Sequence, residues 1–405
     1  MLLSTKKKDL IMVITLVTDQ FWQNNHGTSI SAQRFYNGLV KLGHTVRVVS
    51  IDESNNSIYS LKERYFGKTI TKIINSQGFQ FAKFDKEILK KAITGADIVH
   101  VYLPFKLEQK TIQLCREMNV PFSAAFHLAP ENITSTLYLN KSKLVNGCLW
   151  SSFKNKVYRY AKHIHTPSLM IAKQLEKHKY NCNMHVISNG YNDIFKVQES
   201  VRPEEYKDKF LITFIGRFSR EKRHDLIIKA VNASKYRDKI QLVFGGKGPT
   251  KKHIMKTAKK LPNYPVFSFF TREQLVSLFN YADLYIHPAD IEVEGMSCIE
   301  AIACGCPALV GDSPKSATPQ FTVHEKSLFK HGDYKDLAEK IDWWIEHPEE
   351  LKAERKAVEQ HAHKFTIEKS MPFYIEMFEQ AIKDWDKDFD CKKKGLKPNI
   401  INNYK

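Results

Sequence analysis

The sequence lacks any apolar run that approaches the roughly 18 residues required to span a bilayer. Its opening residues, MLLSTKKKDLIMVITLV, join a basic cluster to a strand-like stretch without a small-residue cleavage site, so they do not resemble a signal peptide. The seven cysteines show no pairing pattern, and Cys304 and Cys306 alone do not supply the ligands of a zinc site. These absences predict a cytoplasmic protein with reduced, structural cysteines.

Short internal repeats and low-complexity segments are also absent, which excludes a solenoid. Hydrophobic residues make up 42% of the chain and charged residues 26%, a balance typical of a globular protein that buries a core. Because single cores stop growing well below 405 residues, the length predicts two domains with a cleft between them.

Acidic residues are scarce in the first half of the chain. The net charge is +18, and residues 1–200 contain 27 Lys and Arg against 14 Asp and Glu, so they carry about +13 of it. Nucleic acid, an anionic membrane surface or solubility alone would each explain such an excess. The sequence shows neither paired zinc ligands nor an aromatic RNA-binding strand, so we expect no nucleic-acid partner.

Strand-like and helix-like segments alternate along most of the chain. Residues 11–19 are apolar on both faces, as in a buried parallel strand, and residues 29–43 form an amphipathic helical pattern that ends at a glycine. A polar stretch at 188–210 interrupts the alternation before a second series begins, which predicts two doubly wound α/β units. We expect domains at 1–192 and 193–364, a helix at 365–390 that packs back across both, and a basic tail at 391–405.

Residues 292–307, EVEGMSCIEAIACGCP, place two glutamates eight positions apart around a glycine. They follow a predicted strand, and ligands of open parallel sheets bind at the carboxyl ends of strands, where helix N-termini present free N–H groups. Gly295 would let the backbone approach a bound group, and the N–H groups of Met296 and Ser297 would point at an anion such as a pyrophosphate. This loop therefore predicts a diphosphate site.

Glu292 and Glu300 suit a different part of the same ligand. An ionised carboxylate accepts two hydrogen bonds, and the paired hydroxyls of a sugar are natural donors. A sugar on either side of a pyrophosphate is a nucleotide sugar. The alternative is that Glu300 caps its own helix or forms a salt bridge within it.

Residues 215–225, IGRFSREKRHD, contain Arg217 and Lys222 near a predicted helix start. Both cations can point into the crevice that the helix dipole also faces. The alternative is that Lys222 forms a surface salt bridge with Glu221 or Asp225.

Together, GRFSREK, FGGKGP, TREQLVSLFNYADLYIHPA and EVEGMSCIEAIACGCP resemble the retaining nucleotide-sugar glycosyltransferases of the fourth sequence family, glycosyl transferases group 1. The resemblance covers most of residues 210–345. It is weaker in the first half, where it rests on VTDQFWQNNHGTSISAQRFYNGLVKLGHTVRVVS and SAAFHLAPE. It implies the GT-B fold, in which two doubly wound Rossmann-like domains, the first on the acceptor side, face each other across a cleft.

The resemblance also implies roles for individual residues. Arg217 and Lys222 would hold the donor diphosphate, and Glu300 would bind the ribose of the nucleotide. Glu292 would contact the sugar hydroxyls near the reacting carbon, and His127 would approach the transferred sugar. A lone histidine at a strand end is more often structural, but its place at the carboxyl end of a strand favours the functional interpretation.

Gly27 lies where the family has its glycine-containing donor loop, although the usual pair of glycines is replaced here by His26 and Gly27. The resemblance implies no metal and no cofactor, since the nucleotide sugar, expected to be UDP-glucose, is a substrate. The overlapping D-x-D patterns in residues 384–390 are typical of metal-dependent transferases of another fold, but here we interpret them as a solvated helix end. GGKGP, residues 245–249, is interpreted as a tight turn beside the donor cleft.

Residues 62–84 and 150–165 interleave Lys and Arg with aromatic residues, which suits a peripheral contact with anionic lipid. The stretch EVEGMSCIEA is similar to the corresponding loop of bacterial diacylglycerol glucosyltransferases. We therefore expect a hexosyltransferase at the inner face of the cell membrane that moves glucose to a lipid such as diacylglycerol. The alternatives are a transferase with a glycan acceptor in polysaccharide or glycoconjugate synthesis, and a catalytically silent relative, against which the intact motifs argue.

Overall fold

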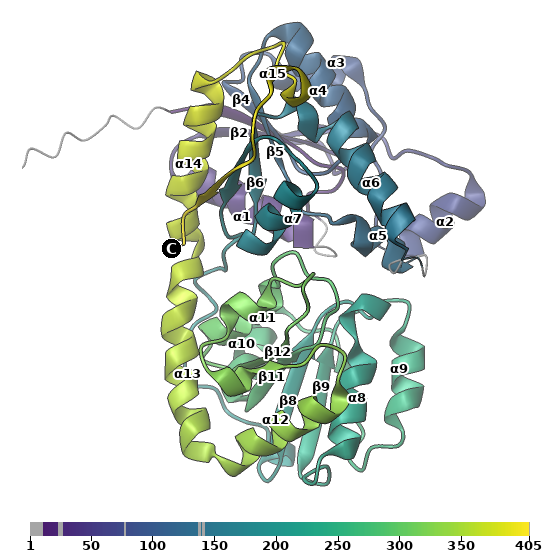
Figure 1. Cartoon of the computed structure of the whole chain (residues 1–405), viewed down its shortest axis with the longest axis vertical. Helices are drawn as coiled ribbons and strands as arrows, with labels where there is room; N and C mark the ends of the chain where they lie inside the picture. The colour runs from purple at the N-terminus through teal and green to yellow at the C-terminus, as the bar shows by residue number, and fades with distance from the viewer. Residues whose placement is uncertain (1–10, 23–26, 77, 137–138, 140–141, 405) are drawn as a thin grey trace, which may run out of the picture.

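The computed structural model describes residues 11–22, 27–76, 78–136, 139 and 142–404. They form two parallel β-sheets, with strand orders β14-β7-β6-β5-β4-β1-β2-β3 and β10-β9-β8-β11-β12-β13. Each sheet is the centre of one lobe, and the lobes are stacked along the long axis of the molecule (Figure 1). The expected GT-B architecture of two Rossmann-like units is confirmed.

The first lobe is built on an eight-stranded sheet. Its strands are β1 (Val13–Val17), β2 (Thr45–Ser50), β3 (Ile58–Ser60), β4 (Ile98–Val101), β5 (Phe122–Ala125), β6 (His163–Thr166), β7 (Asn183–Val186) and β14 (Asn399–Asn402). Its helices are α1 (Gly27–Lys41), α2 (Lys68–Ser76), α3 (Lys86–Ile93), α4 (Lys106–Met118), α5 (Pro130–Thr136), α6 (Lys143–Lys156), α7 (Leu169–Lys177), α14 (Ile367–Lys383) and α15 (Cys391–Lys394).

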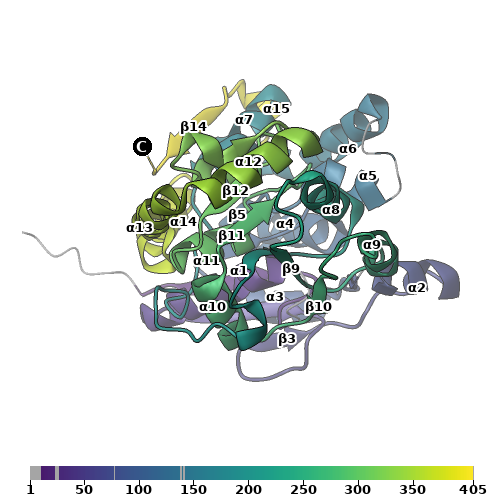
Figure 2. The same cartoon turned by 90° about the horizontal axis from the view of Figure 1, so that it is seen from below.

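The second lobe is built on a six-stranded sheet. Its strands are β8 (Phe210–Ile215), β9 (Ile240–Gly245), β10 (Val266–Ser268), β11 (Leu284–His287), β12 (Ala308–Gly311) and β13 (Leu328–Phe329). Its α-helices are α8 (His224–Ala233), α9 (Lys251–Ala258), α10 (Arg272–Tyr281), α11 (Met296–Ala303), α12 (Tyr334–Glu346) and α13 (Pro348–Ala362), and the 3₁₀-helix η3 (Arg220–Lys222) precedes α8. In the view from below, α8, α9 and α12 cover one face of the sheet, and α10, α11 and α13 lie on the other (Figure 2).

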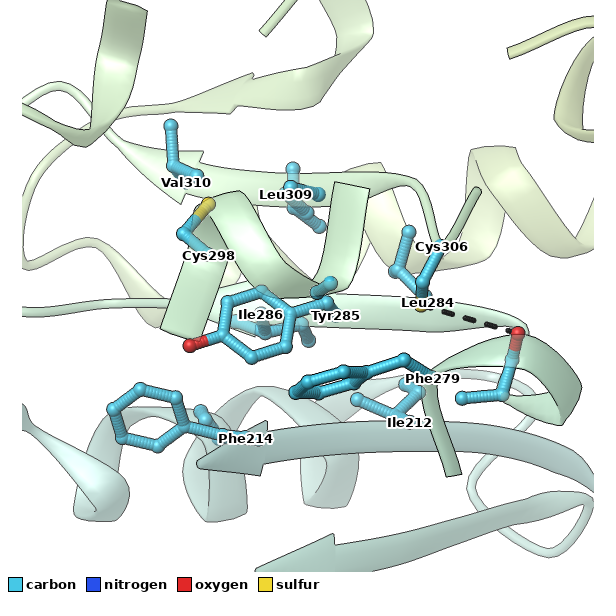
Figure 3. Packing of buried hydrophobic residues seen from close by; sticks show 14 of the residues in the cluster. Ile212, Phe214, Phe279, Leu284, Tyr285, Ile286, Cys298, Cys306, Leu309 and Val310 are labelled. Atoms are coloured by element: carbon cyan, nitrogen blue, oxygen red, sulfur yellow. Dashed lines mark hydrogen bonds between the residues drawn. The ribbon is translucent and has the colours of Figure 1, made fainter. Parts of the chain in front are cut away.

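The hydrophobic core of the second lobe explains why the loop before α11 has a fixed position. Central strands such as β8 and β9 are almost wholly apolar and are buried on both faces, as expected of parallel strands between two helical layers. Figure 3 shows Tyr285 of β11 packed among Phe214 of β8 and Phe279 of α10, with Cys298 of α11 nearby. The hydroxyl groups of Tyr285 and Ser297 lie 2.8 Å apart, so a buried aromatic residue holds the first turn of α11.

The C-terminal helix returns to the first lobe, as expected. After α13, which belongs to the second lobe, the chain continues into α14 along the same side of the molecule (Figure 1). Tyr374 of α14 stacks on Phe35 of α1, with ring centroids 3.7 Å apart, and its hydroxyl lies 2.7 Å from Nδ1 of His165. Gly190 permits the crossing, because it has φ +68° and a Cβ there would lie 2.8 Å from Cα of Ile367.

The segment expected to be a basic tail contains regular structure. Residues Asn399–Asn402 form β14, which pairs in parallel with β7 and extends the first sheet. The hydroxyl of Tyr404 then accepts a hydrogen bond of 2.8 Å from the N–H of Ser188. The sequence NIIN is too short for its periodicity to indicate a strand. None of the described helices is long and apolar enough to cross a bilayer.

Candidate active site

Loops from the carboxyl ends of both sheets meet between the lobes. The hydroxyl of Ser168, in the first lobe, donates a 2.8 Å hydrogen bond to the carbonyl of Val293 in the β11–α11 loop. Ser135 of α5 donates to Glu221 of η3 at 3.2 Å, and Lys315 lies 3.0 Å from Glu131 of α5. These contacts bring the segments that carry the predicted site residues to one interface, as the position of ligand sites in open parallel sheets predicts.

Gly295 allows the sharp turn at the start of α11. It has φ +97° and ψ +55°, and a Cβ at this position would lie 2.4 Å from Cγ2 of Thr318. Met296 and Ser297 follow as the first residues of the helix, where N–H groups have no acceptor within the helix. The hydroxyl of Ser297 is engaged with the carbonyl of Ile215 at 2.8 Å, so its side chain anchors the helix rather than facing a ligand.

Glu292 forms an ion pair with Lys222, which brings together two predicted site residues that are 70 positions apart. Nε2 of His287, at the end of β11, lies 3.2 Å from the same carboxylate oxygen. Burial would raise the pKa of Glu292, but the charge of Lys222 and the contact with His287 lower it to about 2. Glu292 is therefore an ionised carboxylate at neutral pH.

The alternative in which Lys222 pairs with Glu221 or Asp225 is wrong. Glu221 accepts hydrogen bonds from Ser135 and Ser219, whereas Asp225 pairs with Arg223 and Lys229. The fold instead places η3 against the β11–α11 loop, where Lys222 meets Glu292. The N–H of Asp290 donates to the carbonyl of Glu221 at 2.7 Å and fixes this approach.

Arg217 lies half-buried where β8 ends. Burial lowers its pKa, and the charge of Glu221 opposes that shift. The turn GGKGP lies directly against this segment, since a Cβ on Gly246 would lie 2.1 Å from the carbonyl oxygen of Gly216 and one on Gly248 would lie 2.4 Å from that of Phe218. Two motifs from separate strands thus form one surface, and both glycines are required by this close approach.

Glu300 forms an ion pair across the two lobes with Arg34 of α1. Arg34 also donates to the carbonyl of Gly190 and lies 3.7 Å from the sulfur of Met296. Burial raises the pKa of Glu300, while the positive charge of Arg34 opposes the shift. The alternative in which Glu300 is satisfied within its own helix is therefore wrong.

His127 lies on the wall of the first lobe, two residues after β5. It is 9% exposed, it stacks on Tyr102 with ring centroids 5.5 Å apart, and its Nε2 has no hydrogen-bond partner among the described residues. Burial, aided by the charge of His100, lowers the pKa of His127 to about 3. The imidazole is neutral at physiological pH and presents an unsatisfied nitrogen.

Gly27 is the first residue of α1 and lies opposite the start of α11. A Cβ on Gly27 would lie 3.5 Å from Cε of Met296, so the predicted donor loop of the first lobe touches the predicted diphosphate loop of the second. His26, the other residue of that loop, lies outside the described residues.

Three residues near the site were not predicted from the sequence. They are Arg34, His287 and Glu294. The buried carboxylate of Glu294 accepts hydrogen bonds from the hydroxyl of Ser188 and from the N–H and side-chain amide of Asn189. Burial raises its pKa to about 7, although these hydrogen bonds oppose the shift. Glu294 thus ties the site loop to the crossover between the lobes.

Three of the four aspartates in the D-x-D patterns pair with basic side chains. Asp384 pairs with Lys162 and His163, Asp386 pairs with Lys394, and Asp390 pairs with Arg159. These contacts attach the end of α14 and α15 to the first lobe, remote from the loops that carry Glu292 and Glu300.

Two facing Rossmann-like units, with glycine-containing loops and carboxylates between them, define the class of GT-B nucleotide-sugar transferases. Residues 26–193 match the model of Glycosyltransferase Family 4, and residues 196–364 match that of Glycosyl transferases group 1. The chain belongs to this family of retaining glycosyltransferases and is a hexosyltransferase.

The chain is similar to proteins whose names give different substrates. The chain is 23% identical to the alpha-monoglucosyldiacylglycerol synthase of Streptococcus pneumoniae over 325 residues, which cover 75% of this chain and 72% of that protein. It is 22% identical to the GDP-mannose-dependent alpha-mannosyltransferase of Corynebacterium glutamicum over 370 residues, 82% of this chain and 80% of that protein. The sucrose-phosphate synthase of Thermosynechococcus elongatus has a TM-score of 0.73 at 14% identity, over 92% of this chain and all of that chain, and so supports the fold alone.

Proposed function

We propose that this glycosyltransferase moves glucose from UDP-glucose to a membrane lipid of the diacylglycerol class at an anionic membrane surface. The observation that carries the proposal is α2, which projects from the first lobe (Figure 1) and exposes Ile70 by 55% between Lys68 and Lys72. Tyr65, just before α2, is 71% exposed. Apolar side chains flanked by lysines suit insertion into an anionic headgroup layer. The relative in Streptococcus pneumoniae supports a glycolipid product.

In the proposed donor site, Arg217 and Lys222 stabilise the diphosphate together with the N–H groups of Met296 and Ser297. Negative charge on the leaving diphosphate grows during transfer, so fixed positive groups lower the barrier. Gly27 and Gly295 leave room for the backbone to approach the donor. Lys222 serves both the diphosphate and Glu292, because the ammonium group has three donors.

Glu300 binds the ribose hydroxyls and Glu292 binds hydroxyls of the transferred sugar. Both carboxylates already have a cationic partner, which keeps them oriented before the donor arrives. The neutral His127, with its unsatisfied nitrogen, supplies a hydrogen bond to the sugar from the opposite wall. A buried histidine without a partner suits a polar ligand that completes its hydrogen bonding.

Transfer with retention proceeds on one face of the sugar. The bond between the anomeric carbon and the phosphate oxygen breaks as the acceptor oxygen bonds to the same carbon. The proton of the acceptor hydroxyl passes to an oxygen of the departing diphosphate. The enzyme then needs no carboxylate nucleophile, and its contribution is to position the two substrates and stabilise the leaving charge.

Release of nucleoside diphosphate from a panel of nucleotide sugars tests this function. The reaction is run with anionic vesicles that contain or lack diacylglycerol. We expect UDP release from UDP-glucose that requires both the anionic lipid and diacylglycerol. Equal release with and without the lipid acceptor would contradict the proposal.

A glycan acceptor is the second candidate. The relative in Corynebacterium glutamicum is named as a mannosyltransferase that depends on GDP-mannose, so the family comparisons do not favour one donor alone. Donor turnover that is stimulated by oligosaccharides and unaffected by lipid would select this candidate.

A further inference from the structure

A cavity of about 280 Å³ opens in the first lobe between α2 and the start of α4. Its walls are mainly apolar and include Phe66, Ile70, Ile74, Phe81 and Phe105. The ring of Phe81 packs against those of Phe66 and Phe105 with centroids 5.5 and 4.9 Å apart. The volume lies near the lower end of the range for ligand pockets, so it accommodates one apolar chain or a small ring system.

A buried carboxylate forms part of this wall. Asp19 is 1% exposed, and it accepts a 2.7 Å hydrogen bond from the N–H of Ala82 through Oδ1, whereas Oδ2 has no partner among the described residues. Glu108, at the start of α4, is also fully buried. Burial raises the pKa of Asp19 to about 7, and burial together with the charge of Asp19 raises the pKa of Glu108. Unsatisfied buried polar atoms are rare and call for a ligand or another compensating group.

We infer that this cavity, which we call the acceptor pocket, holds the apolar body of an uncharged lipid alcohol, with Asp19 hydrogen-bonded to an oxygen of that alcohol. The inference rests on the proposed function and identifies where its acceptor binds. From the pocket the acceptor extends along the strand ends toward the transferred sugar.

The sheet places the pocket beside the transfer site. Asp19 follows β1 by two residues, and His127 follows β5 by two residues. In the first sheet only β4 separates these two strands, and their ends are in register. Because neighbouring strands are about 4.8 Å apart, the two side chains start about 10 Å apart on the same edge of the sheet. A single acceptor spans that distance.

The charges around the acceptor pocket favour a neutral ligand. An anion would meet the Asp19 carboxyl group at the buried end, and a cation would have to pass Arg64 and Lys106, which line the same cavity. The guanidinium of Arg64 lies 4.6 Å from the ring centroid of Phe66, where it can also contact anionic headgroups. A hydroxyl suits Asp19 in either protonation state, because it both donates and accepts.

Exposed apolar side chains connect the acceptor pocket with the membrane surface proposed above. Ile70 lines the cavity and is also 55% exposed on α2. A lipid that enters from the headgroup layer would therefore pass along α2 without crossing water. The acceptor pocket would therefore bind the lipid itself, whereas the lysines of α2 only attract the bilayer.

Photolabelling tests the location directly. The probe is a long-chain alcohol with a diazirine in its chain, compared with the matching alkane that has no hydroxyl. We expect the alcohol to label peptides that contain residues 66–82 and 105–107, with several-fold less labelling by the alkane. Labelling elsewhere, or equal labelling by both probes, would overturn the inference.

Filling the pocket tests its role in turnover. We expect Ile74→Trp to lower labelling and to raise the KM for the lipid acceptor by about tenfold. Leu144→Trp is the matched control, because Leu144 is 78% exposed on α6 of the same lobe and is not one of the residues that line the cavity. Its KM should equal that of the unmodified protein, and both variants are checked by thermal melting.

The outcomes separate the two proposals. If the unmodified protein shows no lipid-dependent turnover, the proposed function is wrong, and the assignment of the acceptor pocket is wrong as well. If that turnover is present but Ile74→Trp leaves the KM for lipid unchanged, only the assignment of the pocket is wrong.

Discussion

Arg34 of the first lobe and Glu300 of the second form a buried ion pair at the interface between the lobes. The pair holds the carboxylate expected to bind the nucleotide ribose, and the same guanidinium also bonds the carbonyl of Gly190 at the crossover between the lobes. Nucleotide binding and the approach of the lobes are therefore expected to depend on one another. A buried charge that loses its partner is costly, which makes each member of the pair testable.

Glu300→Gln should weaken binding of the nucleotide by about tenfold to a hundredfold, because a hydrogen bond to a charged group contributes roughly 1.5–3 kcal/mol. Titration calorimetry with the nucleoside diphosphate measures the effect. Glu339→Gln, on α12 of the same lobe, is the control and should bind normally. Equal affinities in all three proteins would exclude Glu300 from the ribose site.

Lys222→Ala should lower the rate of sugar transfer by about 10²- to 10³-fold, since it removes a fixed positive charge beside the leaving diphosphate. Lys229→Ala is a suitable control because Lys229 lies on α8 of the same lobe and pairs with Asp225 at the surface. Steady-state kinetics at saturating donor report the difference. A full rate in Lys222→Ala would show that this side chain serves only to orient Glu292.

Gly295→Ala should destabilise the second lobe more than Gly332→Ala. Both glycines have positive φ, +97° and +77°, so alanine is strained at either position. At Gly295 the new methyl group would also approach Cγ2 of Thr318 to 2.4 Å, whereas at Gly332 no atom of the described part of the chain lies within 4 Å of it. Thermal unfolding should therefore show a loss of about 1–3 kcal/mol for Gly332→Ala and a larger loss for Gly295→Ala. Equal losses would mean that the loop before α11 can move away from Thr318.

His224 should make the protein less stable in acid. Burial, assisted by the charges of Lys222 and His287, lowers the pKa of His224 to about 3, against about 6.5 for an unfolded chain. Between these values the unfolded chain binds a proton that the folded protein does not, so the free energy of unfolding decreases as the pH falls below about 6.5. The limiting slope is about 1.4 kcal/mol per pH unit for this group.

Urea unfolding at pH about 7 and about 5 measures this slope. His224→Phe, which keeps an aromatic ring beside Phe218, should reduce the loss of stability between these two pH values by about 2 kcal/mol. The same replacement at the exposed His253 should change the loss little. An unchanged pH dependence in His224→Phe would contradict a buried neutral imidazole.

The sequence predicted the fold and the loops that form the candidate site because those features depend on local patterns. Alternating apolar runs and helical periodicity indicated both Rossmann-like units, and the glycine between two glutamates located the turn before α11. The interaction partners of these residues were harder to predict from the sequence. Arg34 and Glu300 are 266 positions apart, and no local pattern on the helix of Arg34 indicates that its face meets the second lobe.

The features that the sequence left open have the same physical origin. Glu221 and Asp225 were possible partners of Lys222, and packing of η3 against the β11–α11 loop selected Glu292. Residues 391–405 are predicted as a basic tail, and within them pairing with β7 supplies the hydrogen bonds that make residues 399–402 a strand. Tertiary contacts decided both cases.

The most direct measurement is identification of the sugar-containing product. The protein is incubated with UDP-glucose carrying an isotopic label and with anionic vesicles that contain diacylglycerol, and the lipid extract is examined by mass spectrometry and NMR. We predict a labelled glucosyl lipid that retains the anomeric configuration of the donor. Release of UDP without a labelled lipid, or label recovered only in a water-soluble glycan, would contradict a lipid glucosyltransferase.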